Sequence, residues 1–198
     1  MRSVPQGLTL KTEANYSIPE LIKITIPTYH DAFKEGVWKE DLSYEEIAKR
    51  LSKSFATNFH GLWLIDIDNK LVATSWYQFM NLKVLRKEKG AILTRFAKKI
   101  CTEKYIHFIV WHTETITHPN YKSQGLGSLL KKYIFEDLET IAKRYEPILL
   151  LTRMEDDNKA IIKINEELGL KRTGIRMPCT TAPTDPNKYH EFWYKVIN

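Results

Sequence analysis

A glycine-containing segment between a predicted strand and a predicted helix carries the most specific chemical signal in this sequence. The segment reads HPNYKSQGLGS over residues 118–128, and a strongly helical pattern follows it. Gly125 and Gly127 allow a ligand to approach the backbone closely, and the first N–H groups of a helix have no acceptor within the helix. Because the helix dipole is positive at that end, these donors suit a pyrophosphate. The pattern therefore predicts a phosphate-binding loop.

Two common nucleotide-binding motifs describe this segment poorly. A Walker loop needs Gly-Lys-Ser or Gly-Lys-Thr after its glycines, and no such tripeptide follows here. The dinucleotide-binding fingerprint needs a third glycine, and Leu130 stands in its place. Neither motif explains the two glycines, and because glycine is common at helix starts, an ordinary helix start stays the alternative to a phosphate-binding loop.

The segment resembles the signature loop of the GNAT N-acetyltransferase superfamily, which holds the pyrophosphate of coenzyme A with Arg/Gln-x-x-Gly-x-Gly/Ala after a strand. Lys122 stands at the first position, where a basic side chain still allows a phosphate contact. A second block, NKAIIKINEELGL over residues 158–170, is similar to the superfamily's Asn…Tyr-Glu-x-x-Gly-Phe helix. The position that many members fill with a proton-donating tyrosine is Asn165 here, as in members similar to mycothiol synthase.

The resemblance implies that acetyl-CoA is the co-substrate and that no metal takes part. Backbone N–H groups at the end of the strand before the loop are then expected to face the pantetheine and the carbonyl oxygen. Asn158 is expected to contact the pantetheine amide, although the alternative role of capping its helix stays open. The implied cofactor-binding residues are Thr115, Ile116, Thr117, Lys122, Ser123, Gln124, Gly125, Leu126, Gly127, Ser128, Asn158 and Ile161.

Acetyl transfer to an amine needs a base beside the thioester, and Glu114 on the same strand is the first candidate. His112 shares its face by strand periodicity and His118 lies in the turn, so these two remain alternatives. A β-bulge would exchange the two faces, and Glu114 could instead hydrogen-bond a loop backbone. Asn165 is the second catalytic candidate, although an amide donates a hydrogen bond and no proton. A thiol pKa near ~8.5 makes a dedicated acid dispensable.

The elements that position these residues follow from hydrophobic periodicity. We predict an α/β protein of the α+β type with a GNAT fold: a single mixed, mostly antiparallel sheet, a splayed parallel strand pair and helices on both faces. Strands are predicted over residues 8–13, 61–67, 71–79, 106–117, 148–151, 170–177 and 191–197. Helices are predicted from residues 17 and 43 onward and over residues 83–104, 125–145 and 157–168.

Composition and charge bound the remaining possibilities. The 198 residues predict a single N-acetyltransferase domain over 1–198, with a basic insertion at about residues 80–104. With 43% hydrophobic and 27% charged residues, the chain is neither disordered nor collagen-like. Cys101 and Cys179 have no metal-ligand spacing and form no disulfide framework. No apolar run approaches the ~20 residues of a membrane span, so a cytoplasmic protein is expected.

All of the net charge of +6 lies in residues 83–104, which hold eight basic and two acidic residues. We predict one amphipathic helix there, docked through Ile92, Phe96 and Ile100. The charge attracts anions on the acceptor side of the site, or it only keeps the surface solvated. Nucleic acid is not an expected partner, because Phe96 is the one aromatic residue in the segment.

The function expected from the resemblance is N-acetylation of a primary amine by direct transfer in a ternary complex. A small-molecule acceptor is expected, and a homodimer is possible. Two other functions remain open at this point: acetylation of a protein or peptide, and non-catalytic binding of an acyl-CoA.

Overall fold

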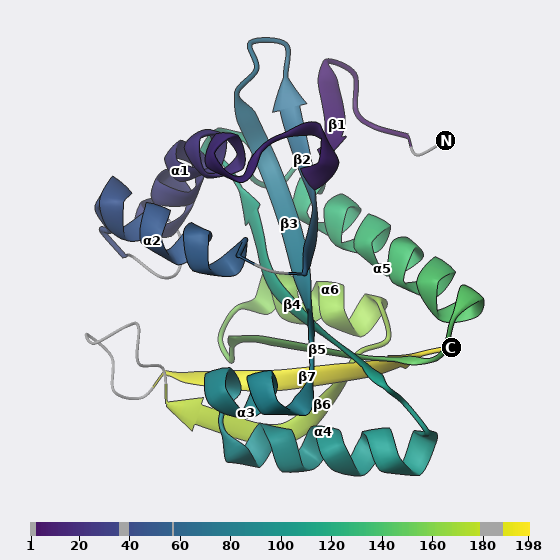
Figure 1. The fold of residues 1–198 in the computed structure, drawn as a ribbon. Helices are drawn as coiled ribbons and strands as arrows, with labels where there is room; N and C mark the ends of the chain where they lie inside the picture. Colours follow the sequence, from purple (N-terminus) through teal and green to yellow (C-terminus); the bar gives the residue numbers. More distant parts are fainter. Residues whose placement is uncertain (1–2, 36–39, 57, 179–187) are drawn as a thin grey trace. The chain divides into compact units, whose positions relative to one another are not determined.

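The structure, a computed structural model, describes residues 3–35, 40–56, 58–178 and 188–198 (Figure 1). The strands are β1 (Leu8–Thr12), β2 (Phe59–Asp66), β3 (Leu71–Met80), β4 (Phe108–Thr117), β5 (Ile148–Glu155), β6 (Lys171–Pro178) and β7 (Tyr189–Ile197). The helices are α1 (Ile18–Glu35), α2 (Tyr44–Ser54), α3 (Leu82–Lys89), α4 (Ala91–Lys104), α5 (Leu126–Arg144) and α6 (Lys159–Glu167), with 3-10 turns η1 (Glu13–Asn15) and η2 (Pro119–Tyr121).

The strands form one mixed sheet in the order β1-β2-β3-β4-β5-β7-β6. β4 and β5 are parallel, with a register from Phe108 opposite Ile148 to His112 opposite Thr152, and β4 continues past it to Thr117. β1 pairs antiparallel with β2, and β7 pairs antiparallel with both β5 and β6. The predicted mixed, mostly antiparallel sheet with one parallel pair is therefore confirmed.

The chain forms two compact units, and each is built from two separate segments. The first unit comprises Met1–Tyr77 and Thr113–Phe135, and the second comprises Gln78–His112 and Glu136–Asn198. β3, β4 and α5 each run from one unit into the other. The single domain over 1–198 stays a prediction.

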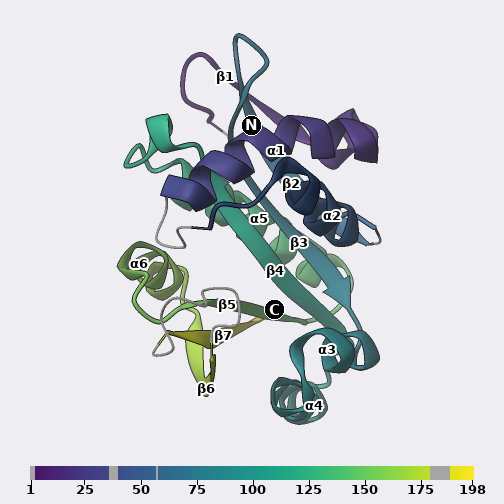
Figure 2. The same cartoon turned by 90° about the vertical axis from the view of Figure 1, so that its left-hand side faces the viewer.

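In the first unit, α1 and α2 lie on one side of β2 and β3, and α5 lies on the other (Figures 1 and 2). Ser43 begins α2 with a capping box, because its hydroxyl accepts from the Glu46 N–H (3.3 Å) and the Glu46 carboxylate accepts from the Ser43 N–H (2.9 Å). The helix predicted from residue 43 onward is confirmed, and Ile47, Leu51 and Phe55, which recur at four-residue steps, are between 0% and 1% exposed. These side chains pack with Trp63 and Trp76 into the core of the unit.

Gly61 is required by the packing of that core. A Cβ atom at this position would lie 2.7 Å from the Trp63 ring and 2.8 Å from the Trp76 Cβ, and both indoles are fully buried. We therefore expect Gly61→Ala to lower the free energy of unfolding by about 1–3 kcal/mol, as overpacked cores do. Urea unfolding followed by circular dichroism measures this change.

The matched control for Gly61→Ala is Gly127→Ala, measured without ligand. A Cβ at Gly127 would lie 3.4 Å from Thr115 Cγ2 and 3.5 Å from Thr117 Oγ1, which is ordinary contact. This variant should unfold close to the wild-type urea midpoint. A Gly61→Ala protein as stable as this control contradicts the packing argument.

In the second unit, α3 and α4 cover one face of β5, β7 and β6, while α6 lies on the opposite face (Figures 1 and 2). The single helix predicted over residues 83–104 is wrong. Gly90, with φ of 88°, ends α3 and begins α4. The predicted stripe is also partly wrong, since Ile92 is 53% exposed and the fully buried residues are Leu93 and Ala97. Phe96 and Ile100 pack partly against the same core.

Three further findings concern the described residues. None of their helices has the length and apolar character needed to cross a membrane. No group of three or more His, Cys, Asp or Glu side chains among them is arranged to hold a metal ion. Cys101 is a free, half-buried thiol, and Cys179 lies outside the described residues.

Candidate active site

The predicted site residues fall into two groups, one in each compact unit. The first unit contains the end of β4 from Glu114 onward, the turn η2 and the glycine segment that leads into α5. The second unit contains Asn158, Ile161 and Asn165, which all belong to α6 or its cap. The predicted position of the glycine segment between a strand and a helix is confirmed.

The chain leaves β4 through η2, and His118 fixes this turn. Its Nδ1 accepts the Asn120 N–H at 3.2 Å, and its backbone N–H donates to the Val72 carbonyl of β3 at 2.8 Å. Pro119 begins the turn, where its fixed φ is already suitable. The turn therefore delivers Lys122 and the residues after it to a defined place beyond the strand.

Residues 122–125 form an exposed loop with unusual backbone angles. Ser123 has φ of 63° and Gly125 has φ of 75°. Lys122 has φ of −59° and ψ of 154°, so Lys122 and Ser123 have the φ values of the two central residues of a type II turn. The second central position, here Ser123, is usually glycine or asparagine. Nothing lies within 4 Å of the place that a Cβ on Gly125 would occupy. The backbone of the loop therefore borders open space, as a ligand cradle requires.

The N-terminus of α5 is anchored beside this loop. Leu126 and Leu130 are 2% and 0% exposed, so their side chains hold the first turns of the helix in the core. The Gly125 carbonyl accepts the first helical hydrogen bond, from the Leu129 N–H at 2.9 Å. The N–H groups of Leu126, Gly127 and Ser128 precede that bond and have no intrahelical acceptor. Because Gly127 has no side chain, α5 approaches Thr115 and Thr117 of β4 closely.

Glu114 is half-buried on β4, and its backbone is tied to β3. The Ser75 hydroxyl donates to the Glu114 carbonyl at 3.1 Å and lies 2.8 Å from the Thr115 hydroxyl. Ser75 is fully buried. Sequence reasoning missed this residue, although a serine within the apolar strand LVATSWYQFM was an available signal.

The side chain of Glu114 shares its surroundings with α1 and α2. Burial, together with the negative charge of Glu114, raises the pKa of Tyr29 far above its ordinary value, while a hydrogen bond from Arg50 opposes that shift. Arg50 in turn donates to the Glu40 carboxylate at 2.8 Å. Tyr29 and Arg50 were also missed, because nothing in the local sequence of either helix indicates that it faces β4.

The structure separates the three candidate bases. The Nδ1 of His118 is occupied as an acceptor, which places its proton on Nε2, 3.5 Å from the Asp31 carboxylate. His112 is 3% exposed in the second unit, with Nδ1 3.4 Å from the Thr152 hydroxyl. Glu114 is a carboxyl group that is half-exposed in the same unit as the loop. The structure therefore places Glu114 in the unit that contains the loop and gives His118 contacts that stabilise its turn, while the assignment of the base stays a prediction.

In the second unit, Asn158 caps α6, since its Oδ1 accepts the Ile161 N–H at 3.3 Å. The capping role is thus present, and the Nδ2 amide hydrogens take no part in it. Asn165 is 0% exposed, and its Nδ2 donates to the Met154 thioether sulfur at 3.3 Å. The Asn165 side chain therefore lies in the interior between α6 and β5.

No protein-family profile and no curated protein matches this sequence. Solved structures do match the fold. The ribosomal-protein-S18-alanine N-acetyltransferase of Escherichia coli is similar with a TM-score of 0.62 and 16% identity, over 96% of this chain and 94% of that chain.

Two further solved structures are similar and contain the cofactor. A GNAT superfamily phosphinothricin acetyltransferase (Pat) of Sinorhizobium meliloti, in complex with AcCoA, has a TM-score of 0.64 and 13% identity, over 98% of this chain and 90% of that chain. The yncA protein of Salmonella typhimurium, with its cofactor acetyl-CoA, has a TM-score of 0.60 and 14% identity, over 96% of this chain and 94% of that chain. At these identities the likeness concerns the fold. The chain has the GNAT N-acetyltransferase fold, as its two motifs predicted.

Proposed function

We propose that this protein is an acetyl-CoA-dependent N-acetyltransferase that acts on the primary amine of a small molecule by direct transfer in a ternary complex. The observation that carries the proposal is the exposed loop of residues 122–125. Ser123 and Gly125 in this loop have positive φ angles, and the loop leads directly into the N-terminus of α5. No other atom lies within 4 Å of the place that a Cβ on Gly125 would occupy. On a GNAT fold, this cradle has the chemistry that a pyrophosphate needs.

The first unit supplies most of the residues assigned to the cofactor. The backbone of the loop and the N–H groups of Leu126, Gly127 and Ser128 would hold the pyrophosphate, and Lys122 would add a positive charge. Backbone N–H groups of Thr115, Ile116 and Thr117 would donate to the pantetheine and the carbonyl oxygen. In the second unit, Asn158 and Ile161 are assigned to the cofactor by the resemblance alone. Bound acetyl-CoA would supply the acetyl group as a thioester.

Glu114 would accept the proton that the amine loses as its nitrogen bonds to the carbonyl carbon. The carbon–sulfur bond breaks in the same reaction, and the sulfur leaves as a thiolate. Because Asn165 is buried against Met154, we do not assign proton donation to its position. A thiol with a pKa near ~8.5 leaves as a thiolate near neutral pH without a dedicated acid.

Two measurements test the proposal. Calorimetric titration with acetyl-CoA should show binding, and a thiol-reagent assay should show release of coenzyme A with at least one amine from panels of small amines, aminoglycosides, polyamines and peptides. Absence of binding contradicts the whole proposal. Binding without release for every acceptor favours the non-catalytic acyl-CoA module, which the buried Asn165 leaves open. Release with peptides alone corrects the acceptor class.

A further inference from the structure

The excess positive charge of the protein is exposed on two helices of the second unit. Residues 83–104 carry a net charge of +6, equal to that of the whole chain. We call their exposed basic side chains on α3 and α4 the basic face: Lys83, Arg86, Lys87, Arg95, Lys98, Lys99 and Lys104. The same helices expose two acidic side chains, Glu88 and Glu103, so basic side chains are in large excess, and such an excess attracts a polyanion.

Little of this charge is neutralised within the described part of the chain. Lys99 Nζ lies 3.9 Å from the Glu103 carboxylate, and both side chains are more than half exposed, so the pair contributes little. Lys89, which is not in the basic face, lies over the Trp111 ring at 4.4 Å. The other six residues of the basic face have no acidic partner among the residues that the structure describes.

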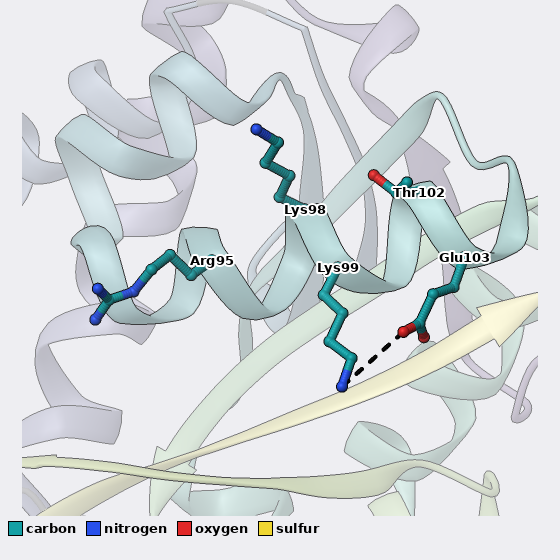
Figure 3. A pocket seen from close by; sticks show the side chains of 5 residues that line it. All are labelled: Arg95, Lys98, Lys99, Thr102 and Glu103. Atoms are coloured by element: carbon teal, nitrogen blue, oxygen red, sulfur yellow. Dashed lines mark ion pairs between the residues drawn. The ribbon is translucent and has the colours of Figure 1, made fainter.

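The central part of the basic face is held in a fixed geometry. Arg95, Lys98, Lys99 and Thr102 recur at spacings of three and four residues, and together with Glu103 they line an open hollow of about 370 Å³. Figure 3 shows the three basic side chains extending from α4 in different directions along the helix. The opposite side of the helix is anchored by Leu93 and Ala97 in the core. The charges are therefore presented on a rigid support.

An exposed aromatic side chain directly follows this helix. Tyr105 is 83% exposed and ends α4 with φ of 55°, a left-handed conformation that a bulky residue rarely adopts. It lies one residue beyond residues 83–104, in which Phe96 is the one aromatic residue. Lys104 beside it is exposed as well. Proteins that bind single-stranded nucleic acid combine a basic surface, which contacts the phosphates, with exposed aromatic rings, on which bases stack.

We propose that the basic face binds single-stranded nucleic acid, with phosphates on Arg95, Lys98 and Lys99 and one base stacked on Tyr105. An exposed ring stacks only with a base that is not already paired in a duplex. An anionic membrane is a poorer fit, because Val84 and Ile92 are the only exposed large apolar residues on the described α3 and α4 and form no continuous stripe. The proposal does not depend on the acetyltransferase activity.

The salt dependence of binding gives the sharpest test. Fluorescence anisotropy with a labelled 20-nucleotide single-stranded RNA, and with DNA of the same sequence, yields Kd from low to high salt. For a single strand, the slope of the logarithm of the association constant against log salt is negative, and each lost phosphate contact makes it less negative by about 0.7. The triple variant Arg95→Gln/Lys98→Gln/Lys99→Gln should therefore have a slope that is less negative than the wild-type slope by about 2. Comparing the Kd values for the RNA and the DNA shows which of the two nucleic acids the basic face prefers.

A second variant tests the aromatic contact separately. Tyr105→Ala should weaken binding by roughly 5- to 100-fold with no change in the salt slope, because stacking is not ionic. The matched control for this variant is Tyr44→Ala, which removes a 54% exposed tyrosine from the first unit. The charge control is Lys23→Gln/Lys49→Gln/Lys53→Gln, three exposed lysines of α1 and α2. Both controls should keep the wild-type Kd and slope.

Three results overturn the proposal. The first is a triple variant with the wild-type Kd and slope. The second is polyglutamate that competes as well as the RNA at equal charge concentration, which assigns the surface to an acidic polypeptide. The third is a Tyr105→Ala variant that binds as the wild type does. Circular dichroism and acetyl-CoA titration of each variant separate a loss of fold from a loss of binding.

Discussion

Replacing Glu114 with glutamine is expected to lower kcat by about 10²- to 10⁴-fold and to leave the Kd for acetyl-CoA unchanged. Glutamine keeps the shape of the side chain but cannot accept the proton of the amine. The backbone anchor from Ser75 to the Glu114 carbonyl does not involve the side chain, so β4 keeps its place in the variant. The loss therefore falls on the chemical step.

The pH profile makes the Glu114 prediction specific. Without the base, the reaction depends on amine that is already neutral, so the remaining rate should keep rising with pH up to the pKa of the acceptor. The matched control is His118→Gln, which removes the imidazole whose Nε2 atom lies 3.5 Å from the Asp31 carboxylate but removes no base that we assign to catalysis. Initial rates from pH 6 to 10 compare the two variants. If Glu114→Gln is unimpaired at every pH, the base is His112, His118 or a chain of waters.

Local signals in the sequence were sufficient to predict where several elements begin and end. The helix predicted over residues 157–168 stops directly before Gly169, and Gly169 follows the end of α6 with φ of 73°. Its N–H donates to the Glu166 carbonyl at 3.0 Å, and the Leu170 N–H donates to the Asn165 carbonyl at 2.9 Å, which together form a Schellman motif. Such caps involve only neighbouring residues, so their chemistry is visible in a short stretch of sequence.

The division between α3 and α4 required information from distant residues. Helical periodicity continues through residues 83–104, and an isolated glycine in such a pattern is tolerated at a small cost. Gly90 breaks the helix because Leu85 on one side and Leu93 on the other are both fully buried against the same core. Packing against strands far along the chain decided the break, and the local pattern does not contain those strands.

Ionisable groups were the least predictable part of the protein. Lys131 lies in a strongly helical run that would equally suit a solvated lysine, yet it is 1% exposed. Burial lowers the pKa of Lys131 to about 7. The surroundings of Glu114 were hidden in the same way, because Tyr29 and Arg50 come from α1 and α2. The loop was predictable because a single segment contains it, whereas the surroundings of Glu114 are assembled from separate elements.

The loop of residues 122–125 gives the second large effect: if it binds the pyrophosphate as proposed, Gly125→Val should weaken acetyl-CoA binding by roughly 100-fold or more. Valine disfavours φ of 75°, so the backbone N–H groups turn away, and its side chain enters the open space above the loop. Losing two charge-assisted hydrogen bonds costs roughly 3–6 kcal/mol, and every 1.4 kcal/mol is about tenfold in affinity. Calorimetric titration measures the loss.

A matched control separates this loss of binding from general strain. Gly7 has φ of 80°, has nothing within 4 Å of a Cβ and belongs to the same unit, but lies outside the loop. Gly7→Val and Gly125→Val should therefore lower the free energy of unfolding by similar amounts, about 1–2 kcal/mol each, because valine disfavours the left-handed backbone. Only Gly125→Val should lose the cofactor. A folded Gly125→Val protein that binds acetyl-CoA as tightly as Gly7→Val does would place the pyrophosphate elsewhere, and the proposed function would lose the observation that carries it.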